Sequence, residues 1–152
     1  MDYTQAFAIS AAGMSVERTR VDVAALNLAN ADTIQTADGV SYRPLRVIAR
    51  SIAAPGNGAF AAEVNRGLGD DGLSMAGLPQ ADVEPQTVEP RQVYEPGHPF
   101  ANKKGFVSYP GVDPATEMVT MTRALRAYEA NVAAMNTART LALKALDIGS
   151  SS

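Results

Sequence analysis

The residues whose types and spacing come closest to a chemical motif form a glycine-rich segment in the middle of the chain. Gly67-Leu68-Gly69-Asp70-Asp71-Gly72 matches the G-x-G-x-x-G pattern of dinucleotide-binding loops. That pattern works between a strand and a helix, but no convincing strand precedes it and Pro79 follows soon afterwards. Two carboxylates also stand where a pyrophosphate would lie. We therefore interpret the segment as a mobile turn and expect no nucleotide.

The other candidates for metal or acid–base chemistry lack partners. Asp70 and Asp71 are not followed by the spaced oxygen ligands of an EF-hand. His98 is the only histidine and lies between Gly97 and Pro99, so we expect a loop residue without the partners of a zinc site or catalytic triad. The chain has no cysteine, which excludes disulfides and thiolate metal sites. We predict no catalytic residue, no metal and no cofactor, and an enzyme is the weakest hypothesis.

Proline and glycine divide the chain into parts that can and cannot form long helices. All nine prolines lie between Pro44 and Pro114, and outside the middle the only glycines are Gly13 and Gly149. We predict an N-terminal helical arm over residues 1–32, a β and loop middle over 33–112, a C-terminal helical arm over 113–149 and a tail over 150–152. The fold class is mainly α, with the two arms pairing as a coiled coil around a Pro/Gly-rich insertion that contains β-structure.

Both arms carry apolar stripes at helical spacing. The N-terminal helix, expected over Tyr3–Ala31, has two stripes about 200° apart, which suggests burial from two sides. The C-terminal helix has a start signal in Asp113, Pro114 and Glu117, followed by an a/d seam that is broken at Arg139. Leu141, Ala145 and Ile148 add apolar surface outside that seam. The predicted assembly interface comprises Phe7, Met14, Val21 and Leu28 on one stripe; Ile9, Val16 and Val23 on the other; and Met118, Met121, Leu125, Tyr128, Val132, Met135 and Leu146 on the C-terminal seam, which resumes at Ala142 after the break.

Asn27 and Asn30 complete the predicted interface and allow two interpretations. They lie three residues apart and therefore share a helix face. One interpretation is a cap at the C-terminal end of the first helix, since asparagine tolerates the conformation that ends helices. The other is that a side-chain amide within a helical seam fixes its register. Both interpretations concern assembly and folding, not catalysis.

The middle of the chain predicts short strands and turns. Ser41 to Ile52 is a plausible strand, with Pro44 at an edge or irregular point, and Gly105 to Tyr109 is a plausible last strand. Three X-Glu-Pro sequences, which end at Pro85, Pro90 and Pro96, favour extended backbone.

Charge and hydropathy exclude several classes of function. The net charge is −3 and no region has a basic surplus, so we expect no nucleic-acid partner. No segment approaches the ~20 apolar residues of a membrane span, so we expect a soluble protein that does not itself cross the membrane. Asp2 stands where a secretory signal would be basic, and the longest early apolar run is only Ala6–Ile9.

The segment Ala24-Ala25-Leu26-Asn27-Leu28-Ala29-Asn30-Ala31-Asp32-Thr33 resembles the signature of bacterial flagellar rod and hook proteins. The opening Phe7–Met14 is similar to the same family. Further segments resemble its proximal rod subunits: Tyr42-Arg43-Pro44, Pro96-Gly97-His98-Pro99, Gly105–Pro110, Arg126–Val132 and Ala142–Gly149. Residues 53–78 match no pattern, so their role stays open.

The resemblance implies a structural subunit of the basal-body rod in the periplasm, one that assembles with other rod proteins and copies of itself. It further implies passage through the flagellar type III export apparatus without a cleaved signal peptide, and terminal helices that pack into the wall of a torque-transmitting tube. The alternatives are another axial subunit of rod or hook and, from another class, a soluble coiled-coil adaptor with a β insertion.

Overall fold

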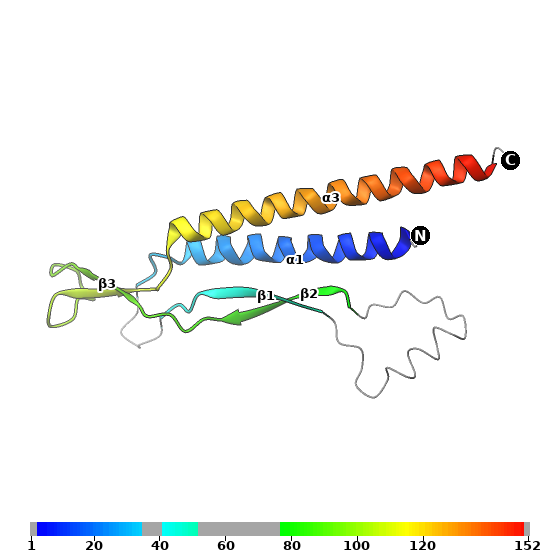
Figure 1. Cartoon of the computed structure of the whole chain (residues 1–152). Helices are drawn as coiled ribbons and strands as arrows, with labels where there is room; N and C mark the ends of the chain where they lie inside the picture. The colour runs from blue at the N-terminus through cyan, green and yellow to red at the C-terminus, as the bar shows by residue number, and fades with distance from the viewer. Residues whose placement is uncertain (1–2, 35–40, 52–76, 151–152) are drawn as a thin grey trace, which may run out of the picture. The chain divides into compact units, whose positions relative to one another are not determined.

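The computed structural model describes residues 3–34, 41–51 and 77–150. The elements follow in the order α1 (Tyr3–Ala29), β1 (Leu45–Ser51), β2 (Pro79–Pro85), β3 (Arg91–Tyr94), β4 (Phe106–Tyr109) and α3 (Pro114–Ser150) (Figure 1). Within these residues the chain has a helix near each end and two small two-stranded sheets, β1–β2 and β3–β4, between them. Both predicted terminal helices are confirmed: α1 ends two residues before the expected Ala31, and α3 differs by one residue at each end from the predicted 113–149.

The start of α3 follows from a side-chain cap. The carboxylate of Asp113 accepts hydrogen bonds from the backbone N–H of Ala115 (3.3 Å) and of Thr116 (3.2 Å), and from the Thr116 hydroxyl. These bonds satisfy donors that the first turn of a helix leaves without partners. They also hold the pKa of Asp113 below its ordinary value, chiefly through the Thr116 hydroxyl. The predicted start signal is confirmed.

The end of α1 uses a side-chain amide. Asn30 donates from Nδ2 to the Leu26 carbonyl at 2.8 Å, and its backbone N–H lies 3.1 Å from the same oxygen. The carbonyls of a last helical turn lack partners within the helix, so these bonds satisfy them. Asn30 therefore bonds the last turn of α1 through its side chain, while the left-handed conformation on which the cap interpretation rested stays a prediction.

The chain divides into two compact units, and each unit takes one part of each helix. The first unit comprises Met1–Glu17, Ala49–Asp82 and Arg126–Ser152, and the second comprises Arg18–Ile48 and Val83–Leu125. Within each unit the α1 segment lies beside the α3 segment, and the two run in opposite directions (Figure 1). Small side chains dominate the core: Ser10 and Val16 are buried in the first unit, and Ala24, Ala31 and Ala124 in the second.

The β3–β4 hairpin is antiparallel and pairs Arg91 with Tyr109 at one end and Tyr94 with Phe106 at the other. Its turn closes at Gly105, whose φ of +80° suits glycine because the left-handed region clashes with a side chain. A Cβ at Gly105 would also lie 2.8 Å from the Tyr94 ring. Val107 is fully buried and anchors the hairpin. The predicted strand at Gly105–Tyr109 is confirmed, one residue shorter.

Some predictions for the middle of the chain agree with the structure, and others differ from it or concern residues outside the described part. β1 begins at Leu45, four residues later than predicted, and the X-Glu-Pro sequence ending at Pro85 forms the end of β2. His98 lies in a turn as predicted, where its Nδ1 accepts from the Phe100 N–H at 3.2 Å. The segment Gly67–Gly72, with the rest of residues 52–76, lies outside the described residues.

Within residues 3–34, 41–51 and 77–150, no group of three histidine, aspartate or glutamate side chains is arranged to hold a metal ion. Neither helix in the same part of the chain combines the length and the apolar character needed to cross a bilayer.

Candidate assembly interface

The predicted interface residues of α1 do not separate into one inner and one outer stripe. Val16 is 3% exposed, whereas Ile9, seven residues earlier on the same predicted stripe, is 51% exposed. The remaining apolar positions are half-buried: Phe7, Met14, Val21, Val23 and Leu28. The face of α1 that is covered most continuously lies between the two stripes. Its residues follow one another at steps of three and four positions: Ala6, Ser10, Gly13, Glu17, Arg20, Ala24, Asn27 and Ala31.

The covered face of α3 is displaced by one residue from part of the predicted seam. Leu125 is 47% exposed while Ala124 is 1% exposed, so the expectation that Leu125 packs within the subunit is wrong. Arg139 was expected to interrupt the seam, but the half-buried residue there is Ala138. The covered face comprises Glu117, Met121, Ala124, Ala127, Asn131, Met135, Ala138 and Ala142, and Thr120 and Val132 beside it are also half-buried. Of the predicted seam, Met121, Val132, Met135 and Ala142 are half-buried, and Met118, Tyr128 and Leu146 are exposed.

One contact shows why small residues line these faces. A Cβ built on Gly13 would lie 3.0 Å from both Nδ2 and Oδ1 of Asn131, so the two helices approach closely at this point in the first unit. Asn131 itself donates from Nδ2 to the Ala127 carbonyl at 3.0 Å, one turn earlier. The distance between packed helices depends on the side chains at the contact, and here glycine sets it. Sequence reasoning missed this contact, although Gly13 stands out as the one glycine inside α1.

Asn27 performs neither of the two roles predicted for it. Its side chain is 1% exposed, and its Nδ2 donates to the Leu45 carbonyl at 2.8 Å. Its Oδ1 accepts from the Leu45 N–H at 2.9 Å and from the Tyr42 hydroxyl at 2.8 Å. The amide therefore bonds both backbone groups of the first residue of β1, as a neighbouring strand would. This residue joins α1 to the start of the sheet, which corrects both the capping and the seam interpretations.

The surroundings of Tyr42 favour the protonated form of its hydroxyl group. Burial, with a smaller contribution from the Glu117 carboxylate, raises the pKa of the Tyr42 hydroxyl above its ordinary value. The hydroxyl therefore stays protonated and donates to Asn27. Sequence reasoning did not find this partner, because Tyr42 and Asn27 are separated by a segment without a periodic pattern.

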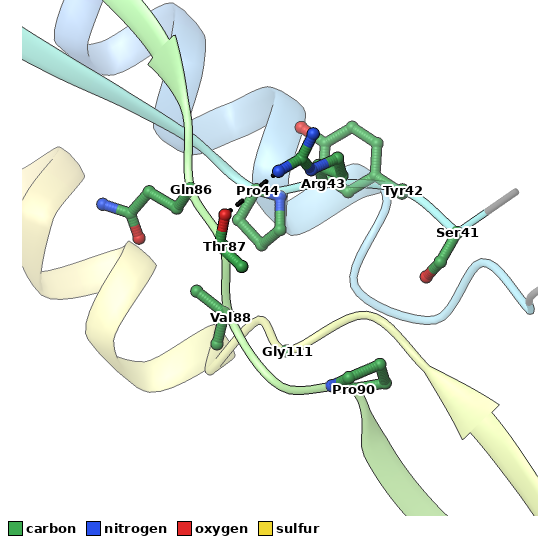
Figure 2. Close-up of a pocket in the computed structure, with 9 residues that line it drawn as sticks. All are labelled: Ser41, Tyr42, Arg43, Pro44, Gln86, Thr87, Val88, Pro90 and Gly111. Atoms are coloured by element: carbon green, nitrogen blue, oxygen red, sulfur yellow. Dashed lines mark hydrogen bonds between the residues drawn. The ribbon is translucent and has the colours of Figure 1, made fainter.

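Figure 2 shows the chain next to this point, where residues 41–44 cross residues 86–90. Arg43 donates from Nη2 to the Thr87 hydroxyl at 3.0 Å, and the Gln86 N–H donates to the Pro44 carbonyl at 2.7 Å. Gly111 lies against the same crossing, and a Cβ there would meet the Glu89 carbonyl and the Val88 side chain. Only glycine permits this close approach of two backbones.

A second link connects the end of α1 with the β3–β4 hairpin. Arg91 donates from Nη2 to the Asp32 carboxylate at 3.2 Å, and its guanidinium lies 5.3 Å from the centre of the Tyr109 ring. Tyr109 donates in turn to Glu95 at 3.3 Å. The ion pair is exposed on both sides, so we assign it a small contribution to stability. Asp32 and Asn27 thus connect one end of α1 to both sheets.

Comparison with known proteins identifies the family. A model of the flagellar basal body rod FlgEFG protein C-terminal family matches residues 103–148, which include β4 and most of α3. The flagellar basal-body rod protein FlgC of Escherichia coli O6:H1 is 37% identical over 143 residues, covering 94% of this chain and 95% of its own. The chain belongs to the FlgC family. FlgC of Salmonella typhimurium (36% over 143 residues) covers 94% and 95%, and FlgC of Bacillus subtilis (35% over 145 residues) covers 93% and 94%.

Membership in the FlgC family makes the chain a structural subunit of the flagellar basal-body rod and not an enzyme. The resemblance expected from Ala24–Thr33 and the later segments is therefore confirmed. Four residues of Ala24–Thr33 have contacts described above in this FlgC family member. Ala24 is buried in the helix pair, Asn27 bonds the start of β1, Asn30 bonds the end of α1, and Asp32 pairs with Arg91 of the hairpin.

Proposed function

We propose that the chain is a proximal rod subunit that assembles with other rod proteins and with copies of itself into a torque-transmitting tube. In this proposal the arms over residues 1–32 and 113–149 form the wall and the middle over 33–112 faces outward. The observation that carries it is the amount of large apolar surface left uncovered on α3. Eight of its exposed large residues are Met118, Val119, Leu125, Tyr128, Leu141, Leu143, Leu146 and Ile148.

The large apolar side chains of this uncovered surface are not needed for packing α3 against α1. Leu146 is 69% exposed and Ile148 is 73% exposed, whereas the covered face beside them uses alanine. Burying a leucine or isoleucine side chain contributes about 1.5–3 kcal/mol, so leaving several in water favours a partner that covers them. On α1, Ile9 and Leu26 are also exposed, at 51% and 46%.

We further propose that the contacts between subunits have coiled-coil character. Met118, Leu125 and Val132 recur every seven residues beside the covered face of α3, up to the break at Arg139. Such a row favours packing of one helix against another along its length. In this arrangement the small-residue face holds the helices of one subunit together, and the row of larger residues meets a neighbouring subunit.

A pair of aspartate variants tests this assembly. Leu125→Asp places a charge on an exposed position, so we expect the subunit to fold and be exported at normal levels while rods and motility are lost. The physical reason is that the charge becomes buried only at the contact with a neighbour, which costs several kcal/mol. The matched control is Thr122→Asp, an exposed position on the same helix. The measurements are swimming and the yield of purified basal bodies, and full motility of Leu125→Asp would contradict the assembly.

We also propose that the subunit reaches the periplasmic rod through the type III export apparatus and keeps its N-terminus, with the export information around Tyr3–Gly13. The support is membership in the FlgC family, whose relatives are named as flagellar basal-body rod proteins. Deleting residues 3–13 is expected to leave the subunit in the cytoplasm. Mass spectrometry of the subunit from purified basal bodies gives the second measurement, and a shortened N-terminus there would refute the proposal.

A further inference from the structure

A groove in the second unit gathers arginine side chains from three separate elements. Arg20 comes from α1, Arg46 from β1 and Arg123 from α3, and they line a space of about 560 Å³. Glu117 is the one carboxylate among the lining residues. The other lining residues are Val23, Ala24, Leu45 and Val47, which are apolar, and Gln86, Thr116 and Thr120, which are polar.

The charge of this groove is opposite to that of the chain. Three arginine residues and one glutamate line the groove, although the net charge of the protein is −3. A guanidinium offers its N–H groups as a planar fork that matches a carboxylate in two parallel hydrogen bonds. Arg46 and Arg123 are both exposed, so their N–H groups are accessible from outside.

We propose that this groove receives an acidic side chain of a neighbouring axial subunit; this inference rests on the proposed assembly function and names one of its contacts. The apolar lining residues favour a glutamate, since its methylene groups can pack on Val23 and Val47 while its carboxylate meets the arginines. A small free anion would gain nothing from those apolar residues.

The position of the groove supports a protein partner. Its α3 residue Arg123 shares a helix face with Val119, which lies four residues earlier and is exposed at 49%. An acidic side chain from a neighbour that covers this apolar surface would reach the groove without a separate interface. The charge then selects the partner and its orientation, because complementary charges contribute more to specificity than to affinity.

Charge reversal at the groove tests the proposal. Arg46→Glu and Arg123→Glu are each expected to leave export unchanged and to lower the yield of basal bodies by about tenfold or more, with loss of swimming. The control Arg126→Glu changes a charge three residues further along α3, at a residue that does not line the groove, and it is expected to swim. Arg123→Gln removes the positive charge without adding a negative one, and it tests the proposal if the Glu variants are degraded. We expect Arg123→Gln to lower the yield of basal bodies less than Arg123→Glu does.

Selection of swimming revertants from Arg123→Glu identifies the occupant. We expect second changes that replace an aspartate or glutamate of an axial subunit with a neutral or basic residue. Normal swimming of both reversals, an equal defect in Arg126→Glu, or revertants confined to Glu117 would each overturn the proposal. If Leu125→Asp blocks rods while both reversals swim, only this contact is wrong; if all three swim, the assembly itself is wrong.

Discussion

Val16→Asp is expected to prevent folding of the subunit. Val16 is 3% exposed in the first unit, so an aspartate there would be buried without a partner. Burying an unpaired charge costs several kcal/mol, which is comparable with the total stability of about 5–15 kcal/mol of an ordinary domain. We therefore expect rapid degradation in cells and no rods, measured as the steady-state level of the subunit and the yield of basal bodies.

Ile9→Asp is the matched control for this variant. Ile9 lies two turns before Val16 on the stripe predicted from the sequence, yet it is 51% exposed. We expect its aspartate variant to reach normal levels, because the charge stays in water within the subunit. If assembly covers Ile9, rods are still lost, but from a folded and exported subunit. Equal levels of the two variants would show that the burial of Val16 is not what the structure indicates.

The second large effect is expected from Asn27→Leu. This change removes three hydrogen bonds at a residue that is 1% exposed, and it leaves both backbone groups of Leu45 without their partner. Each buried polar group without a partner costs about 1–3 kcal/mol, so we expect a loss of about 2–4 kcal/mol in the free energy of unfolding. Thermal unfolding followed by circular dichroism measures this loss, and hydrogen exchange at the Leu45 amide locates it.

Two further variants separate the bonds of Asn27 from one another. Tyr42→Phe removes only the hydroxyl bond and is expected to cost about 0.5–1.5 kcal/mol. Asn30→Ala removes an exposed bond at the end of α1 and is expected to leave exchange at Leu45 unchanged. If Asn27→Leu unfolds no earlier than Asn30→Ala, the attachment of β1 to α1 does not depend on this amide.

The helices were predictable because residues near each helix end determine where the helix begins and ends. Proline and glycine are confined to the middle, and the cap at Asp113 needs only residues two and three positions away. The strands were harder to predict because their limits depend on distant partners. β1 starts at Leu45 and not at Ser41, and the residue that bonds its first backbone groups is Asn27, 18 positions earlier.

Part of the helix-pair seam was predicted one residue away from its observed place, because the sequence pattern was assigned from large apolar side chains. In this chain the helices pack through small residues such as Ala24 and Ala124, which allow a close approach. The larger residues beside them, such as Leu125, remain exposed. A sequence that serves an assembly contains two apolar patterns, and a single chain does not reveal which pattern is covered within the subunit.

The contact of Gly13 with Asn131 has a mechanical consequence. One turn along α1 in either direction from Gly13, the residues are Ile9, Ser10, Val16 and Glu17, and each carries a side chain. If the first-unit segment of α1 slid by one turn, about 5.4 Å, one of these side chains would be driven into Asn131. Gly13 is therefore expected to oppose sliding of the two helices along their axes in the first unit, which is the load that the proposed torque-transmitting rod would place on them.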